Sequence, residues 1–207
     1  MASGCLVKVV CSDVRHNFLV HYIAAVGALI LSSAVFGFAE LDERMAAQPL
    51  ELLSPIIGVI LMTPVFLPEQ NEGVYDVVRS KKTSHILVCF LRLMCSVLLT
   101  TGLVGALSVY MKFNDSQVTL RLFAGAAGSG LALGSLGFFA AAVGDSTVVG
   151  YMVSVAYLLM DMFMREKLKV FNLLNFSCGK TEINTWLYVT AAVLIAAALL
   201  FRRFVKR

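Results

Sequence analysis

Six long runs of apolar residues divide this chain, and only short polar segments separate them. A helix needs about 20 predominantly apolar residues to cross the hydrocarbon core of a bilayer, and the runs are close to that length. The pattern therefore predicts an all-α integral membrane protein with six transmembrane helices in a single domain over residues 1–207. The predicted spans are residues 17–39, 50–67, 86–111, 118–143, 148–164 and 185–201, so spans 1 and 2 fall within 17–67 and spans 3 to 5 within 86–164.

The longest polar segment, residues 68–85, lies between the second and third predicted spans. It opens with Pro68 and carries three acidic and three basic residues. Its valines recur at the spacing of one helical turn, at Val74, Val77 and Val78. This period predicts a short amphipathic helix. Because it joins two spans, the helix would lie at the membrane surface, where a soluble partner can reach it.

The two ends of the chain indicate its orientation. Residues 1–16 are predicted to form an interfacial helix that leads into the first span. Residues 184–207 contain the last span and a tail in which four of the last six residues are basic. Six spans place both termini on one side, and the positive-inside rule makes that side cytoplasmic. We therefore expect a multi-pass protein of the bacterial inner membrane, with both termini in the cytoplasm.

The composition agrees with lipid as the surrounding solvent. The chain is 59% hydrophobic and only 14% charged, whereas soluble domains are about 25% charged. The basic residues lie at the ends of spans rather than in one patch, so we expect no nucleic-acid partner. The five cysteines show no metal-type spacing, and no catalytic residue types cluster. We therefore predict neither a metal site nor a catalytic site.

Charged residues inside the predicted spans are candidates for function, because a charge is costly in lipid. Asp161 and Arg165 are four residues apart, which predicts an ion pair near the outer end of the fifth span; a place in a cation or substrate pathway is the alternative for Asp161. Arg92 is expected to extend its guanidinium to the cytoplasmic interface. Glu51 lies close enough to the outer end of its span to reach water.

The fourth predicted span is rich in glycine, and its Gly-Ser-Gly sequence at 128–130 invites comparison with an intramembrane serine protease. That chemistry requires a base within hydrogen-bond reach of the serine, and the three histidines lie at the opposite ends of spans. We therefore favour close helix packing through small residues. The glycines concerned are Gly125, Gly128, Gly130, Gly134 and Gly137.

In its layout the chain resembles the membrane subunit of an ABC exporter of the ABC-2-type permease family. The shared order is an N-terminal interfacial helix, two spans, a short amphipathic cytoplasmic helix and four further spans. The closest local match runs from Glu69 to Ser80, and Arg92 follows as a base in the third span. In that family an acid, a small residue and a turn of helix ending in serine form the coupling helix, which sits in a groove on the ATP-binding subunit.

The resemblance implies that residues 68–85 form a cytoplasmic coupling helix. The residues that it assigns to coupling are Glu69, Glu72, Gly73, Tyr75, Asp76, Arg79 and Ser80. It also implies that residues 165–183 dip into the outer leaflet, with Leu173 and Leu174 on their apolar face. ATP and Mg²⁺ would bind to the partner ATPase subunits, since this chain has no nucleotide-binding motif; it would hold no cofactor and would not itself be an enzyme.

The function that these expectations favour is a permease subunit that moves an amphipathic or lipid-like substrate. Its expected partners are ABC ATPase subunits, a second permease copy or a homologous permease, and membrane lipid. One alternative is a non-transport membrane protein, either a small membrane enzyme or an assembly factor. A secondary transporter is the other, although the sequence has neither a repeated half nor paired buried charges.

Overall fold

The computed structural model describes residues 18–70, 85–163, 172–174 and 184–205, and all regular structure within these ranges is helical. The second helix is extended by a 3₁₀ segment. The elements are α2 (Leu19–Phe36), α3 (Glu43–Met62), η2 (Thr63–Gln70), α5 (His85–Phe113), α6 (Leu120–Gly144), α7 (Thr147–Phe163) and α8 (Thr185–Val205). The interfacial helix predicted over residues 1–16 lies outside the described residues.

Five of the described helices are long and apolar enough to cross a bilayer, which confirms the predicted all-helical, multi-pass membrane architecture. They cover Leu19–Phe36, Glu43–Pro68, Val88–Phe113, Leu120–Gly144 and Thr185–Phe204. The helix at the position of the fifth predicted span, α7, has only 17 residues. The sixth span therefore stays a prediction.

The second helix begins earlier than the apolar run predicted. Helix α3 starts at Glu43 rather than at residue 50 and contains both Pro49 and Pro55. The prediction was wrong because it placed the start where the polar residues end. The first turns of α3 are amphipathic, with Ala46 and Ala47 buried against the bundle while the charged side chains remain exposed.

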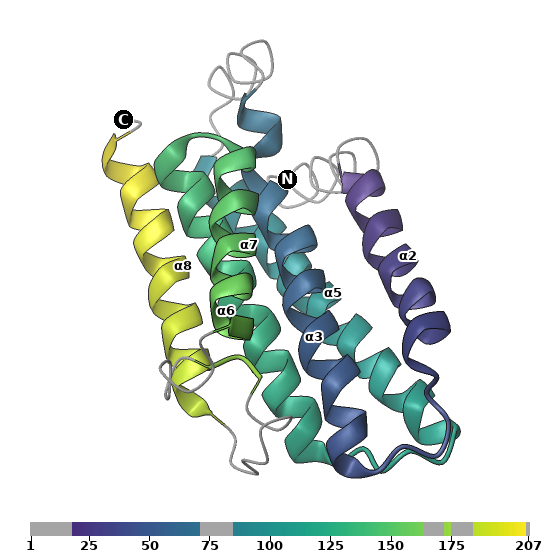
Figure 1. Cartoon of the computed structure of the whole chain (residues 1–207). Coiled ribbons are helices and arrows are strands. Elements are labelled where there is room, and N and C mark those ends of the chain that lie inside the picture. The colour runs from purple at the N-terminus through teal and green to yellow at the C-terminus, as the bar shows by residue number, and fades with distance from the viewer. Residues whose placement is uncertain (1–17, 71–84, 164–171, 175–183, 206–207) are drawn as a thin grey trace.

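Successive helices run in alternate directions along the bundle (Figure 1). The start of α2, the end of η2, the α6–α7 turn and the end of α8 therefore lie together at one end, which we call the upper end. The connections 37–42 and 114–119 lie at the opposite, lower end. This alternation agrees with the order of the six predicted spans.

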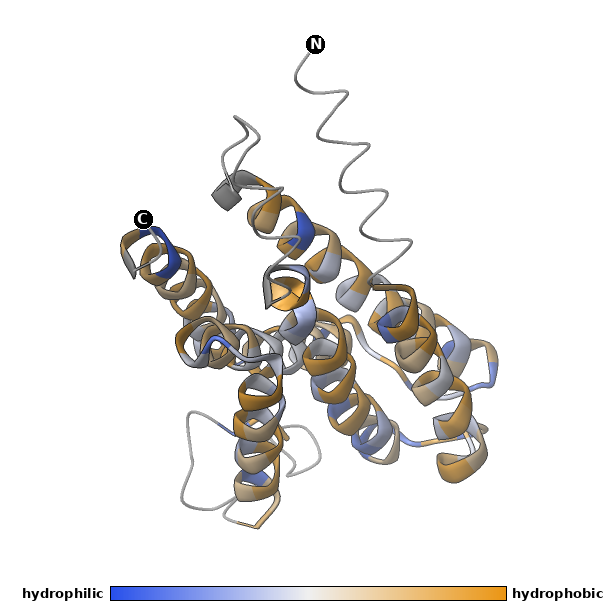
Figure 2. Ribbon diagram, turned by 90° about the horizontal axis from the view of Figure 1, so that it is seen from above, coloured by the Kyte–Doolittle hydropathy of each residue, from blue (hydrophilic) through white to orange (hydrophobic). Residues whose placement is uncertain are grey.

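Helices α3 and α6 form the centre of the bundle. In the most apolar 18-residue stretch of each helix, 78% of the residues of α3 with η2 and 72% of those of α6 are buried, against 11% in α2. Many large apolar side chains are exposed on the described helices, and the ribbon coloured by hydropathy is hydrophobic along most of the helices (Figure 2). A soluble bundle would place polar residues there, so this surface suits the hydrocarbon of a bilayer.

Glycines bring the backbones of α3 and α6 together. A Cβ atom added to Gly134 would lie 2.7 Å from the carbonyl oxygen of Gly58. One added to Gly130 would lie 2.7 Å from the carbonyl oxygen of Ser54. Both distances are well inside van der Waals contact, so no larger residue fits without separating the helices. We call Gly58, Gly130 and Gly134 the glycine seam.

Helix α6 also approaches α7 and α8 through glycines. A Cβ added to Gly150 of α7 would lie 2.6 Å from the carbonyl oxygen of Gly137. A Cβ added to Gly128 would lie 2.9 Å from the ring of Tyr188 on α8. The predicted packing role of the glycines is thus confirmed at Gly128, Gly130, Gly134 and Gly137, with a different helix meeting each part of the row.

Hydrogen bonds join the two connections at the lower end. The Ser116 hydroxyl donates to the carbonyl of Phe38 at 2.8 Å and accepts from the amide of Leu41 at 3.3 Å. The amide of Glu40 donates to the carbonyl of Asn114 at 3.0 Å. These bonds fix the start of α3 relative to α6, because the same two connections lead into both helices.

We expect Gly58→Ala to destabilise the bundle by roughly 1–3 kcal/mol, the usual cost of added bulk in a packed core. The new methyl group would meet the carbonyl of Gly130. Gly102→Ala on α5 is the matched control, since a Cβ there has nothing within 4 Å. Unfolding in mild detergent, followed by helical circular dichroism, measures the difference. Equal stability of the two variants would contradict the glycine seam.

Candidate functional site

Most of the residues predicted to couple to an ATPase lie outside the described residues. Glu69 belongs to η2, but its side chain is not among those described. The other six, Glu72, Gly73, Tyr75, Asp76, Arg79 and Ser80, fall in the range 71–84, which the structure does not describe. The helix predicted over this segment therefore stays a prediction. The structure does describe the elements that attach the segment to the bundle.

The incoming attachment is η2, and its apolar side chains are buried. Val65 and Phe66 are almost fully enclosed and pack against Phe138 of α6 and its neighbours. The Phe66 and Phe138 rings stack with their centroids 4.6 Å apart, a favourable aromatic geometry. The chain that leads into the predicted coupling segment is therefore fixed to the central helix.

An arginine from the last turn of α8 covers this aromatic pair. The guanidinium carbon of Arg202 lies 4.4 Å from the centroid of the Phe66 ring, in cation–π contact. Its Nη2 atom lies 2.9 Å from a carboxylate oxygen of Asp145, in the α6–α7 turn. We call Phe66, Phe138, Asp145 and Arg202 the upper-end cluster. It ties η2, α6, the α6–α7 turn and α8 to one another.

The sequence pattern did not predict the upper-end cluster. Arg202 was assigned to an exposed basic tail, but α8 continues to Val205 and buries the Arg202 side chain. The next residue, Arg203, is exposed, as predicted. The position of each arginine around the helix could have distinguished the buried Arg202 from the exposed Arg203. Arg202 follows Ala198 and Leu199 of the packed face of α8 at one-turn spacing.

Asp161 is buried completely, with 0% of its surface exposed, near the lower end of α7. Its carboxylate accepts the amide proton of Leu173, with its two oxygens 3.2 and 3.3 Å from the nitrogen. The side chain of Asn172 accepts from the amide of Leu174 at 2.8 Å. Residues 172–174 are not helical, and Leu173 and Leu174 are buried. Buried non-helical backbone needs such acceptors, because lipid offers none.

The predicted ion pair between Asp161 and Arg165 stays a prediction, because Arg165 lies outside the described residues. What the sequence did not predict is the bond from Asp161 to the backbone. A buried acid at the end of a span, followed by a short semi-polar segment, was the available signal. Leu173 and Leu174 are buried inside the bundle, and the dip of residues 165–183 into the outer leaflet stays a prediction.

Two other charged residues lie inside the bundle, contrary to prediction. Glu51 is 1% exposed and Arg92 is 5% exposed, so neither reaches water as expected. The prediction was wrong because it considered how deep each residue lies along its span and not which way its side chain points around the helix. Glu51 shares a buried face of α3 with Ala47 and Ser54, and Arg92 shares a buried face of α5 with Cys89 and Ser96.

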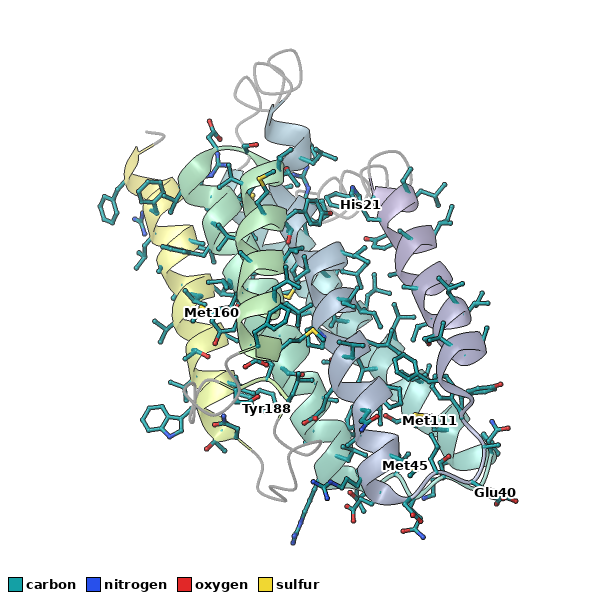
Figure 3. All side chains as sticks on the ribbon, in the orientation of Figure 1. His21, Glu40, Met45, Met111, Met160 and Tyr188 are labelled. Atoms are coloured by element: carbon teal, nitrogen blue, oxygen red, sulfur yellow. The ribbon has the colours of Figure 1, made fainter. Side chains whose placement is uncertain are left out.

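Individual polar side chains join the outer helices to the rest. Tyr188 of α8 donates its hydroxyl to the carbonyl of Ala124 on α6 at 2.6 Å, in the lower half of the bundle (Figure 3). His21 of α2 lies near the upper end, with its Nδ1 atom 3.3 Å from the Tyr151 hydroxyl of α7 (Figure 3). These contacts hold helices that otherwise present largely apolar faces to their surroundings.

An apolar groove of about 420 Å³ lies beside α8 in the same half of the bundle as Asp161. Its walls come from α6, α7, α8 and the segment 172–174. Tyr157 and Leu173, which both lie close to Asp161, form part of them. The size is within the range of roughly 300–1,000 Å³ typical of small-molecule sites.

Comparisons with known proteins add no relative: no protein-family model, curated protein or solved structure matches the chain. Within the described ranges, no three histidine, cysteine or acidic side chains are placed to hold a metal ion. Among the described residues, the two features that could serve a function are the contacts that attach η2 to the bundle at the upper end and the apolar groove in the lower half.

We expect Asp161→Ala to destabilise the protein by about 1–3 kcal/mol, since it removes the acceptor of a buried amide. Asp161→Asn keeps a carbonyl oxygen and should retain most of the stability. Hydrogen–deuterium exchange of a peptide containing residues 172–174 measures the effect locally. We expect faster exchange in the alanine variant than in the asparagine variant. Equal exchange in the wild type and both variants would show that Asp161 does not hold this segment.

Proposed function

We propose that the chain is the permease subunit of an ATP-driven exporter similar to the ABC-2-type family. It would dimerise with a second copy or a homologous permease and bind two ATPase subunits, which carry ATP and Mg²⁺. Residues 68–85 would form the coupling helix. Glu69, Glu72, Asp76 and Arg79 would make charged contacts with the ATPase, and the cargo would be an amphipathic or lipid-like molecule.

The observation that carries this proposal is the attachment of the polar segment at its two ends. On one side it continues from η2, which extends the most buried helix of the bundle, α3. On the other side it leads into α5, which begins at His85. A force applied to the segment would therefore act directly on the centre of the bundle. A merely solvated surface loop does not require such an attachment.

The upper-end cluster would distribute that force. Movement of η2 displaces Phe66, which contacts Phe138 of α6 and Arg202 of α8. Arg202 in turn holds Asp145 at the start of the α6–α7 turn. Closure of the two ATPases would then move these helices as a rigid unit and open the path between the two permeases to the opposite side.

The proposal includes a six-span topology with the upper end in the cytoplasm. Helix α7, with 17 residues, extends for about 26 Å at the helical rise of 1.5 Å. The hydrocarbon core is about 30 Å thick, and a short helix can be accommodated by local thinning of the bilayer. The chain would lie in a bacterial inner membrane, with both termini and residues 68–85 on the cytoplasmic side.

Single-cysteine labelling tests this topology in a background that lacks the five native cysteines. We expect Asp76→Cys to be shielded from a membrane-impermeant maleimide in intact cells and to react after lysis. Arg44→Cys and Asn114→Cys, at the lower end, should react in intact cells. Labelling of residue 76 from outside would exclude the proposed orientation, and with it contact between this segment and a cytoplasmic ATPase.

A double charge reversal tests the coupling helix itself. Glu72 and Asp76 are four residues apart and would share one face of the helix. Glu72→Lys with Asp76→Lys should leave insertion and yield unchanged, because both side chains would face water in the proposed helix. Like charges across an interface cost several kcal/mol. We therefore expect loss of the co-purifying ATPase and of export.

The control for the charge reversal has the same charge change at the lower end, Asp42→Lys with Asp115→Lys, at two exposed positions. It should retain the ATPase. Equal retention of the ATPase by both double variants would contradict the coupling helix. A stable, active protein that never co-purifies with an ATPase would instead favour a secondary transporter or a non-transport membrane protein.

A further inference from the structure

The apolar groove beside α8 has a buried floor and an exposed rim. Leu133 of α6 and Leu187 of α8 are buried at its floor. Trp186, Val189 and Val193 line it as well, and each is more than half exposed. The groove is therefore a recess that opens through the outer surface of the bundle rather than an enclosed cavity.

The walls of the groove are held in place. The hydrogen bond from the Leu173 amide to the Asp161 carboxylate holds Leu173 in place. Thr190 faces the groove, but its hydroxyl donates to the carbonyl of Leu187 in its own helix at 2.9 Å. The lining thus presents almost entirely carbon atoms, and its shape is set by a buried polar contact behind it.

Neither water nor empty space suits this recess. A stable bound water needs two to four polar partners, which the lining does not supply. An empty recess forfeits the dispersion contacts of every side chain around it. Helix α8 is apolar and of spanning length, and only 22% of the residues in its most apolar stretch are buried. We therefore expect lipid along its exposed face. The neighbour best able to fill the recess is a hydrocarbon chain.

The position of the groove indicates which part of a lipid it receives. Lining residues on α8 extend from Trp186 to Leu194, or about 12 Å along the helix axis at the helical rise. Trp186 is the second residue of α8, at the lower end of the bundle. Tryptophan prefers the level of the lipid headgroups. A lipid whose headgroup lies beside Trp186 would direct an acyl chain along the groove toward the middle of the bilayer.

We propose that this groove binds one acyl chain of a bilayer phospholipid from the leaflet at the lower end. The proposal requires only that α6 and α8 span the membrane. It is independent of ATPase coupling and of the identity of any cargo. A bound chain would complete the packing between α6, α8 and residues 172–174, where the protein alone leaves a gap.

Photo-crosslinking tests the proposal on the full chain in nanodiscs. The nanodiscs contain phosphatidylethanolamine and phosphatidylglycerol, with a small fraction of phosphatidylglycerol that carries a diazirine at the end of one acyl chain. After irradiation, mass spectrometry locates the adducts. We expect adducts on Ala132, Leu133 and Leu136 of α6, which a chain in the groove contacts and which lie behind its rim.

Two substitutions on α8 provide a matched pair. Thr190→Phe places a ring in the groove, and filling an occupied site costs at least about 1.4 kcal/mol, so adducts on α6 should fall roughly tenfold or more. Ala192→Phe adds a ring at an exposed position that does not line the groove, and labelling of α6 should persist. If Thr190→Phe fails to fold, Val193→Trp blocks the exposed rim instead and should give the same loss.

Several results would overturn the proposal. Adducts confined to rim residues such as Val189 and Val193, with none on α6, would show that lipid only covers the outer surface. Equal labelling of α6 in the groove-filling variant and in Ala192→Phe would show that the label reaches α6 by another route. Loss of all labelling, together with a disulfide between two copies of a Val193→Cys variant that lacks the native cysteines, would identify a second copy as the occupant.

Discussion

The close approach of α3 and α6 is the constraint on which the rest of this bundle depends. Lipid tails are as apolar as leucine, so burial of apolar surface does not drive helices together in a membrane. Association must come from dense packing and hydrogen bonds, and the glycine seam permits both. The Ser54 hydroxyl donates across it to the carbonyl of Ala126. Helix α6 then receives α7 at Gly137 and α8 at Gly128, so each neighbour is placed relative to the seam.

Two of the buried charged groups in this bundle lie where the backbone changes direction. At the lower end, the Asp161 carboxylate satisfies an amide of the non-helical residues 172–174. At the upper end, Arg202 joins the Asp145 carboxylate to an aromatic pair where α3 gives way to η2. Both are costly groups to place in or near hydrocarbon, and each is matched by a specific partner. The two ends differ in consequence: the Asp161 contact shapes a groove, and the Arg202 contacts hold η2, the segment that precedes residues 71–84.

The positions of the helices could be predicted because length and hydropathy along the chain determine what can cross a bilayer. The packing role of Gly130 and Gly134 was also predictable, since only small residues permit close backbones in lipid. The direction in which each side chain points around its helix could not be predicted. Glu51, Arg92 and Arg202 are buried because of neighbours contributed by distant parts of the chain. The role of Asp161 depends on the backbone of Leu173, and no side-chain pattern records that partner. The coupling residues from Glu72 to Ser80 remain sequence predictions.

The distribution of close packing indicates which parts of the bundle can move together. Helices α3, α6 and α7 meet through backbone contacts that allow little sliding, because a shift would move carbonyl oxygens away from the glycines and toward residues that carry a Cβ atom. Helix α2, in contrast, buries few of its residues. It packs against α3 through side chains such as Ala25 and Leu29 and contacts Tyr151 of α7 through His21. A force entering through η2 would therefore move the central helices as one body, while α2 can change its position at smaller cost. If the chain is a permease, the switching motion would then occur where the central helices meet α2 and other neighbours, and not between the central helices themselves.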